Sequence, residues 1–303
     1  MRVFIAGASG VLGRRVVALL VGAGHDVSGV ARSDGRAILL EGLGATPIRV
    51  ELFDADAMTR AVAGHDVVCN LATHIPPTFK ATRPGAWVEN DRIRNEASRI
   101  LADASLAGEV PRYVQESIAF LYRDGGPHWL DESSPIDPVA GLRSATVAES
   151  SAARVTASGA IGVTLRFGAF YGPDSESSLA MIKLAKRRIA LNAGPDRYVS
   201  SITTDDAAAA VVAAASAPAG LYNIGDDDPV TCREYFAALA GALGVRPPFI
   251  APAGLAKLGG AMVAAVTRSQ RVSNGAFVEA TGWRPVQPSV REGWPVVAAA
   301  AAT

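Results

Sequence analysis

Short runs of hydrophobic residues alternate with amphipathic segments along the first half of the chain. Runs of strand length occupy residues 3–6, 27–31, 48–50, 67–71, 113–114 and 163–167. Segments with hydrophobic residues at helical spacing lie between them, at 11–21, 37–43, 57–63, 93–106 and 146–158. Nearly all-apolar strands joined by helices are typical of a parallel sheet that is covered on both faces. The pattern therefore predicts an α/β fold, a Rossmann-type doubly wound parallel sheet with right-handed crossovers.

The alternation becomes irregular after Phe167. A Gly-Pro pair at 172–173 interrupts the chain, an Ala-rich helical segment follows Thr203, and residues 221–224 have the composition of one more strand. The remainder reads as helices broken by prolines. We therefore expect an NAD(P)-binding Rossmann domain over residues 1–167. A smaller substrate-binding lobe is expected over residues 168–303, with the chain re-entering the sheet near 200–224.

Three glycines follow the first strand directly and open the first helix. In such a turn the first glycine permits the tight bend, the second lets the backbone approach a pyrophosphate, and the third lets the helix pack closely on the sheet. The N-terminus of the helix then faces the phosphates. The segment predicts a dinucleotide site formed by Gly7, Ser9, Gly10, Val11, Leu12, Gly13 and Arg14.

The end of the second strand indicates which dinucleotide is preferred. Sheets that bind NAD carry an acidic residue there, which accepts hydrogen bonds from the ribose hydroxyls. This chain has Ala31-Arg32 instead. A guanidinium favours the additional 2′-phosphate of NADP, so NADP is predicted in preference to NAD. The alternative is that Arg32 is a solvated loop residue.

Composition narrows the class of partner. The 303 residues carry 29 basic and 29 acidic side chains, which argues against a nucleic-acid or anionic-membrane partner. Cys69 and Cys232 match no metal-ligand spacing, so no metal site is expected. The apolar stretches are shorter than the roughly 20 residues that span a bilayer, and the chain opens on a strand. We therefore expect a cytoplasmic protein that binds a small-molecule substrate.

Several further segments resemble one known family. They lie at residues 51–54, 70–73, 90, 166–173, 200–206, 222–225 and 281–285. With the glycine turn, they resemble the extended short-chain dehydrogenases/reductases, the NAD(P)-dependent epimerase/dehydratase family. The resemblance covers most of the chain and implies further cofactor contacts from Glu51, Leu52, Leu71, Ala72, Thr73 and Phe167. Relatives often dimerise through two helices, here 93–106 and 146–158, so a homodimer is one expectation and a monomer the other.

The usual catalytic residues of that family are missing. Its members that transfer hydride use a Ser or Thr four residues before a Tyr-Gly pair, and a Tyr-x-x-x-Lys whose tyrosine is the general acid/base. Counted back from Tyr122, the first position holds Ile118. Counted back from Glu149, the other two positions hold Gly141 and Ala145, and no Tyr-x-x-x-Lys occurs between residues 112 and 170. The chain thus resembles the atypical branch of the family, which keeps the cofactor fold but replaces or loses the acid/base set.

Tyr122, Ser117 and His74 are the candidates for acid/base chemistry instead. The resemblance places Tyr122 at a position that faces substrate. Ser117 ends the fifth strand, and His74 follows the fourth strand with an imidazole that titrates near neutral pH. These positions are at the carboxyl ends of the strands, where such sheets bind ligands. For His74, an ordinary surface residue is the alternative.

Other polar residues have two possible roles. Glu116 also ends the fifth strand, and because a buried carboxylate needs a partner, we expect an ion pair with Arg143 or Arg166 at least as readily as a catalytic role. By analogy, Arg197, Tyr198 and Tyr171 are expected to contact substrate.

Two functions stay open on this evidence. The first is an NADP(H)-binding enzyme that acts on a small organic substrate, by oxidoreduction or by a redox-neutral step, without the usual triad. The alternative is a non-catalytic NAD(P)-sensing or scaffolding protein, which the loss of the catalytic positions favours. The retained 166–173 segment and the second lobe favour the enzyme, although the fold alone does not identify a reaction.

Overall fold

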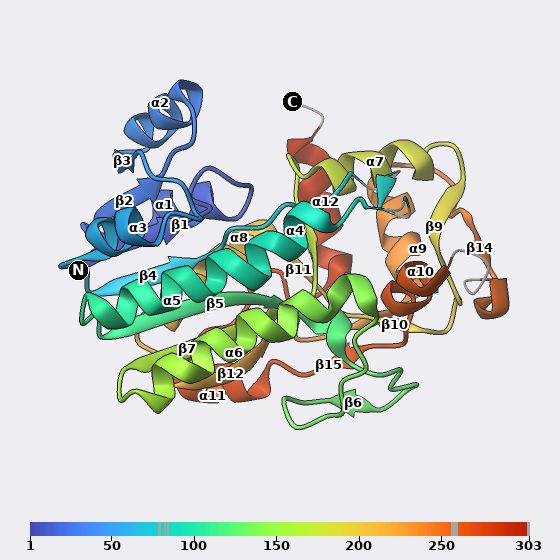
Figure 1. The fold of residues 1–303 in the computed structure, drawn as a ribbon. Coiled ribbons are helices and arrows are strands. Elements are labelled where there is room, and N and C mark those ends of the chain that lie inside the picture. The colour runs from blue at the N-terminus through green and yellow to red at the C-terminus, as the bar shows by residue number, and fades with distance from the viewer. Residues whose placement is uncertain (78–79, 82, 84, 256–259, 302–303) are drawn as a thin grey trace.

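Seven parallel strands form the central sheet of the protein (Figure 1). The computed structural model describes residues 1–77, 80–81, 83, 85–255 and 260–301. The order across the sheet is β3-β2-β1-β4-β5-β7-β12, and every neighbouring pair is parallel. The strands are β1 (Arg2–Ala6), β2 (Asp26–Val30), β3 (Thr46–Ile48), β4 (Val67–Asn70), β5 (Arg112–Ile118), β7 (Ile161–Phe167) and β12 (Gly220–Ile224). This order confirms the predicted doubly wound sheet.

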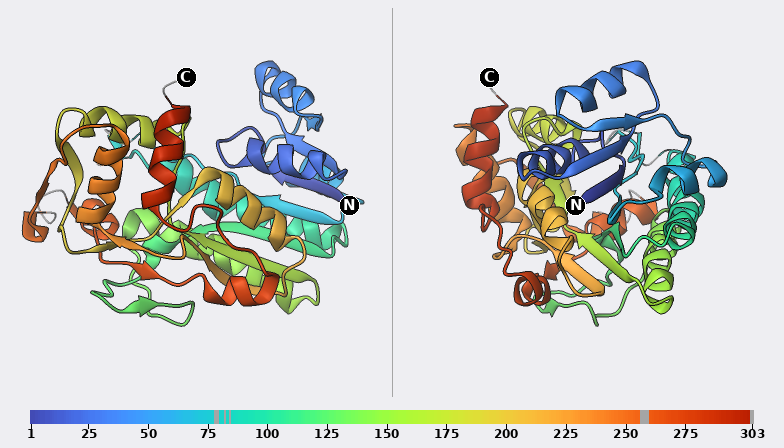
Figure 2. Two further views of the ribbon diagram at one scale, coloured as in Figure 1. Left: turned by 180° about the vertical axis from the view of Figure 1, so that it is seen from behind. Right: turned by 90° about the vertical axis from the view of Figure 1, so that its left-hand side faces the viewer.

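Helices cover both faces of the sheet, as the end-on view in Figure 2 shows. Successive strand residues point to opposite faces, so Val3 and Ile5 of β1 pack in one hydrophobic cluster, whereas Phe4 and Ala6 pack in another. The first cluster includes residues of α1 (Gly13–Gly22), α2 (Asp34–Gly42), α8 (Thr204–Ala214) and α11 (Gly275–Thr281). The second includes residues of α3 (Ala55–Val62), the π-helix η2 (Ile93–Ala97), α5 (Ser98–Ala107) and α6 (Arg143–Ala157). The short helix α4 (Val88–Arg92) leads directly into η2.

The second lobe combines short helices with two-stranded sheets. Its core contains Tyr171, Phe236 and Trp294. The paired strands are β8 (Ala169–Tyr171) with β11 (Ser201–Thr203), β9 (Ile189–Ala193) with β14 (Phe249–Ala251), and β10 (Tyr198–Val199) with β13 (Val230–Thr231). The helices are α7 (Glu176–Ala185), α9 (Cys232–Ala242), α10 (Gly260–Val266) and α12 (Val290–Ala300).

Short elements after β5 connect the sheet to this lobe. They are the 3₁₀ turns η3 (Ala119–Leu121) and η4 (Ala140–Leu142), and β6 (Trp129–Leu130), which pairs with β15 (Arg271–Val272). The chain returns to the sheet as β12, which pairs with β7. The division into domains at residue 167 stays a prediction.

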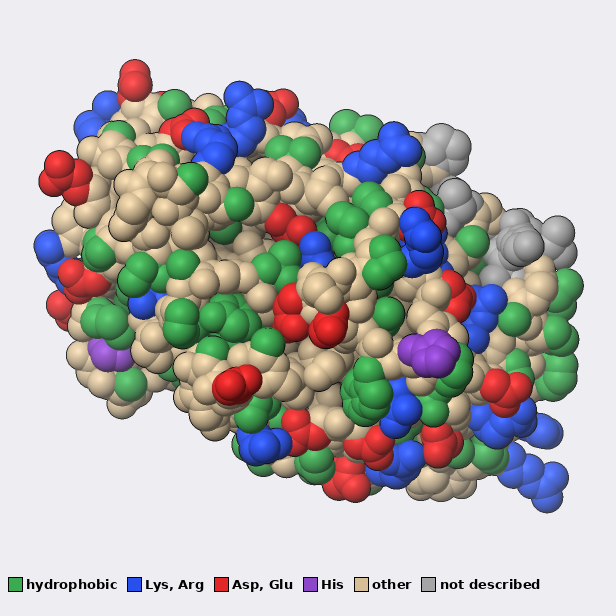
Figure 3. All heavy atoms as spheres, turned by 90° about the horizontal axis from the view of Figure 1, so that it is seen from below, with side chains coloured by type: hydrophobic (Ala, Val, Ile, Leu, Met, Phe, Trp, Pro, Cys, Tyr) green, Lys and Arg blue, Asp and Glu red, His purple; other side chains and the backbone are tan. Residues whose placement is uncertain are grey.

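The surface carries mixed charge. On the face in Figure 3, basic and acidic side chains are interspersed with hydrophobic ones. Among the described residues, no helix combines the length and the apolar character that a membrane span needs. Within the same residues, no group of three or more His, Cys, Asp or Glu side chains is arranged to hold a metal ion.

Candidate active site

The turn between β1 and α1 can be built only with glycine at two positions. Gly7 has φ +85°, and an added Cβ would lie 2.5 Å from the carbonyl oxygen of Leu71. At Gly13, an added Cβ would lie 2.1 Å from the carbonyl oxygen of Gly7. The Gly10 amide donates to that same oxygen at 3.0 Å and closes the turn. The backbone is therefore held close to the first turn of α1, as a pyrophosphate cradle requires.

The amides at the start of α1 remain available for a ligand. Among the described residues, the backbone N–H groups of Val11 and Leu12 have no hydrogen-bond partner. Gly10 is exposed and Ser9 is half-buried. Free amides at a helix N-terminus favour a bound anion. The residues of this turn therefore fit the diphosphate of a dinucleotide.

The end of β4 lies beside this turn. The Leu71 amide donates to the Ala6 carbonyl at 2.9 Å, and the Ala72 amide donates to Asn70 Oδ1 at 3.3 Å. Thr73 follows, half-buried. Strand pairing thus brings these predicted contacts next to the glycine turn, although they are more than 60 residues away in the sequence.

The other predicted cofactor residues lie around the same edge of the sheet. Glu51 is exposed and Leu52 is buried in the second cluster. Phe167 ends β7 and packs against Phe170, with their ring centroids 5.1 Å apart. Their cofactor contacts stay predictions.

The two arginines predicted at the cofactor site differ in their surroundings. Arg32, just beyond β2, is exposed and makes no ion pair among the described residues. Arg14 pairs with Asp174, which also binds Arg15 at 2.9 Å. Arg15 further pairs with Asp205 at the start of α8. Among the described residues Arg32 thus has no acidic partner, whereas Arg14 has one.

The candidate acid/base residues at the end of β5 have internal partners. Ser117 is fully buried and donates to Glu149 Oε1 at 2.7 Å. Arg166 donates to both oxygens of Glu149 at 2.7 Å, and its guanidinium lies over the Tyr122 ring. The Tyr122 hydroxyl donates to Asn223 Oδ1 at 2.7 Å, and burial raises the pKa of Tyr122. These side chains form a buried network in which their polar groups are already engaged.

His74 lies apart from that network. Its side chain is exposed, and its backbone amide donates to Asn90 Oδ1 at 3.0 Å. No contact joins it to Tyr122 or Ser117 within the part of the chain that the structure describes. The catalytic roles of the three residues stay predictions.

Glu116 has a different partner from either of those expected. Arg94 Nη2 donates to both carboxylate oxygens at 3.0 Å, so the expected pairing with Arg143 or Arg166 is wrong. Arg94 comes from the π-helix η2 and is 1% exposed. Burial raises the pKa of Glu116, and the Arg94 charge opposes that shift. The sequence showed that a partner was needed but did not show which arginine the π-helical turn brings to it.

Gly141 and Ala145, at which the tyrosine and lysine of the family are expected from the sequence, have apolar surroundings. Gly141 lies in η4, and an added Cβ would lie 2.5 Å from the Met262 methyl carbon and 3.7 Å from the Trp87 ring. Ala145 is fully buried in a cluster with Leu121, Leu142 and Ala265. Side chains from α10 and from the approach to α4 therefore occupy the space beside Gly141. No motif or periodicity in the sequence indicates this contact.

A parallel sheet with a glycine turn after its first strand defines a dinucleotide-binding Rossmann protein. The chain belongs to the family described as NAD(P)H-binding, whose model matches residues 7–218. This confirms the expected NAD(P)-binding domain and the resemblance to the short-chain dehydrogenases/reductases.

Two relatives match most of the chain. The chain is 32% identical over 305 residues to 3-diazoavenalumate denitrifying reductase from a Streptomyces species, across 97% of this chain and 99% of the relative. It is 27% identical over 274 residues to 4-hydroxy-2-methyl-3-oxo-4-farnesyl-3,4-dihydroquinoline-1-oxide ketoreductase of Stigmatella aurantiaca, across 86% of this chain and 80% of the relative. Both names describe reductases.

Solved structures share the fold. The human epimerase family protein SDR39U1 with NADPH superposes with a TM-score of 0.83 at 21% identity, over 99% of each chain. The Thermus thermophilus UDP-glucose 4-epimerase with NAD gives a TM-score of 0.80 at 21% identity, over 100% of this chain and 99% of the epimerase. Since these neighbours contain different cofactors, they leave the choice between NAD and NADP open.

Proposed function

We propose that the protein is an NADPH-dependent reductase that acts on a small organic acceptor without a protein proton donor. The glycine turn and the free amides of Val11 and Leu12 support the dinucleotide. The exposed Arg32, which has no acidic partner among the described residues, supports NADP over NAD. When bound, the cofactor supplies a hydride.

The observation that carries this proposal is the apolar character of the Gly141 and Ala145 positions. Reduction of a carbonyl needs a proton for the oxygen as well as a hydride for the carbon. Neither Gly141 nor Ala145 can donate a proton, and the side chains closest to Gly141 are those of Met262 and Trp87, which offer no acidic group. Such a site suits an acceptor that needs the hydride alone.

An arenediazonium ion is an acceptor of this kind. The Streptomyces relative is named for a diazo compound and for denitrification, and we propose a diazo-bearing aromatic substrate for this chain as well. The ring carbon gains the hydride and forms a C–H bond, while the C–N bond breaks and its electron pair leaves with dinitrogen. The products are the arene, dinitrogen and NADP⁺, and the balance needs no proton.

The test is NADPH consumption by the purified protein with a benzenediazonium salt or with acetophenone as acceptor. We expect turnover of the diazonium salt above the rate without protein, and none of the ketone. The Gly13→Ala variant, whose added methyl would meet the Gly7 carbonyl, serves as the control without a cofactor site. Preferential reduction of the ketone would contradict the proposal. NADPH binding without any turnover would favour the sensing or scaffolding role.

A further inference from the structure

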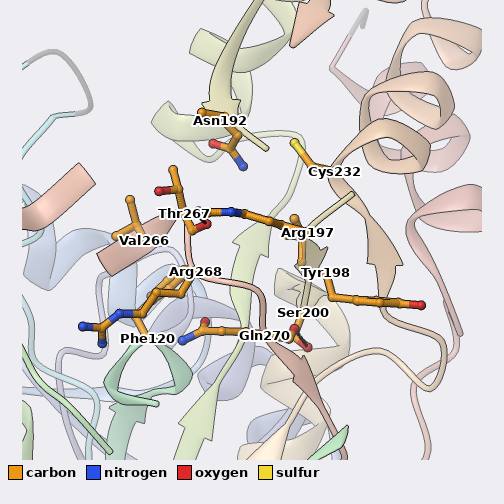
Figure 4. A pocket seen from close by; sticks show the side chains of 12 residues that line it. Phe120, Asn192, Arg197, Tyr198, Ser200, Cys232, Val266, Thr267, Arg268 and Gln270 are labelled. Atoms are coloured by element: carbon orange, nitrogen blue, oxygen red, sulfur yellow. Dashed lines mark hydrogen bonds between the residues drawn. The ribbon is translucent and has the colours of Figure 1, made fainter. Parts of the chain in front are cut away.

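A small cavity lies beside η3, lined mainly by residues between 192 and 270. Its volume is about 20 Å³, and we call it the inner cavity. Figure 4 shows its lining, which comes from η3, from β9 and β10, from the start of α9 and from the segment that joins α10 to β15. The lining residues are Phe120, Asn192, Ala193, Arg197, Tyr198, Val199, Ser200, Cys232, Val266, Thr267, Arg268 and Gln270.

The inner cavity contains a cation without an acidic partner. No carboxylate is among its lining residues. Arg197 extends across it toward Thr267, as Figure 4 shows, and its guanidinium makes one hydrogen bond, to the Thr267 carbonyl oxygen, among the described residues. Arg268 is neutralised by Asp137 at 2.7 Å. A guanidinium has five N–H donors, so most of those of Arg197 remain available.

The fold holds Arg197 in place from several sides. Gly194 has φ +83°, and an added Cβ there would lie 2.5 Å from Arg197 Cδ. The Arg197 side chain can therefore fold back over this turn only because residue 194 is glycine. The Arg197 amide donates to the Gly194 carbonyl at 3.1 Å, and the Cys232 amide donates to the Arg197 carbonyl at 2.7 Å. A capping box of Thr231 and Glu234 fixes the start of α9 beside it.

Cys232 does not supply the missing negative charge. Its thiol lines the inner cavity, but burial raises its pKa to about 11, although the charges of Arg197 and Arg233 oppose the shift. The thiol is therefore neutral at physiological pH.

A second, larger cavity is also lined by Arg197, and we call it the outer cavity. It has a volume of about 620 Å³, within the usual range for small-molecule pockets. Phe249, Ile250 and Pro252 supply apolar lining, and Arg197 lines both cavities. Two carboxylates also line this outer cavity: Asp196 pairs with Arg233 at 3.2 Å, and Asp124 accepts from the backbone amides of Gly126 and Ser269. An organic anion could therefore reach Arg197 through a roomy and largely apolar approach.

We propose that the inner cavity is the carboxylate subsite of the substrate, with Arg197 as its anchor. Its volume suits a carboxylate head group and not a whole ligand. Planar bidentate contact with a carboxylate is the preferred use of a guanidinium. Phe120 lines the inner cavity and also packs in the apolar cluster around Ala145. This subsite rests on the proposed function, and it assigns the hydride acceptor to the class of aromatic carboxylic acids.

The test compares cinnamate with its uncharged analogue cinnamamide by calorimetric titration of the protein with saturating NADP⁺. We expect cinnamate to bind about 10- to 100-fold more tightly, the range for a charged hydrogen-bonded pair. Arg197→Gln should abolish this preference and leave cinnamamide and NADPH binding unchanged, whereas Arg197→Lys should retain part of it. Arg246→Gln is the matched control, because Arg246 is exposed, lines neither cavity and makes no ion pair among the described residues, and it should keep the full preference.

Three results would overturn the assignment. They are equal binding of the two probes to the wild type, a preference that persists in Arg197→Gln, and competition by inorganic phosphate as strong as that by cinnamate. The last would make the cavity a phosphate subsite. Failure of the proposed function is separate, because it would show as absent diazonium turnover in a protein that still prefers cinnamate.

Discussion

The proposed preference for NADPH over NADH rests on Arg32, and replacing Arg32 by glutamine tests that preference. Arg32 is exposed just beyond β2 and has no acidic partner among the described residues. A unit charge pair at about 4 Å is worth about 1 kcal/mol in bulk water, and a 2′-phosphate carries about 1.5 to 2 charges. The expected loss for NADPH is therefore about 1.5–2 kcal/mol, or about 10- to 30-fold in Kd.

The assay is a titration of wild type and Arg32→Gln with NADPH and NADH, followed by cofactor emission and by quenching of intrinsic fluorescence. NADH lacks the phosphate, so its Kd should change less than about twofold. Arg99→Gln, an exposed arginine on α5, controls for the loss of one surface charge. An unchanged Kd for NADPH in Arg32→Gln, or an equal loss for both cofactors, would refute the reasoning.

Three further predictions concern the glycine turn, a buried carboxylate and Tyr122. Gly13→Ala forces a methyl group against the Gly7 carbonyl, so it should lower the free energy of unfolding by about 1–3 kcal/mol and remove most NADPH binding. Gly22 has open space around it, so the control Gly22→Ala should change neither stability nor NADPH binding. Burial raises the pKa of Asp226 well above its ordinary value, so the folded protein loses stability as pH rises from the ordinary carboxyl pKa up to that raised pKa. Asp226→Asn should therefore stabilise the protein by about 1–3 kcal/mol at neutral pH, and equal denaturant midpoints there would contradict this. Tyr122→Phe removes the hydrogen bond to Asn223 and should lower the free energy of unfolding by about 1–3 kcal/mol. Its kcat should stay within about twofold of the wild-type value, whereas a hundredfold fall in kcat would identify Tyr122 as the proton donor.

The sheet and the glycine turn could be predicted because their signals are local. Apolar strands alternate with helical segments, and the glycines at 7, 10 and 13 occur at the one junction where a turn must be tight. Strand order then follows from handedness and from the usual crossovers. Parallel pairing of β1 with β4 brings residues 71–73 to the turn without further information.

The partners of buried charges could not be predicted in the same way. Glu116 meets Arg94 because a π-helical segment turns that side chain inward, and no periodicity in the sequence marks it. Arg14 meets Asp174 across 160 residues of chain. Met262 reaches Gly141 because α10 packs beside η3 and η4, and this depends on how the second lobe folds back.

An isotope-transfer experiment shows whether the protein delivers a hydride without a protein proton donor. A single turnover of benzenediazonium with NADPH deuterated at the reactive nicotinamide position should give benzene that carries one deuterium. The same reaction with unlabelled NADPH in heavy water should give unlabelled benzene. Deuterium from the solvent in the product, or none from the cofactor, would contradict the account.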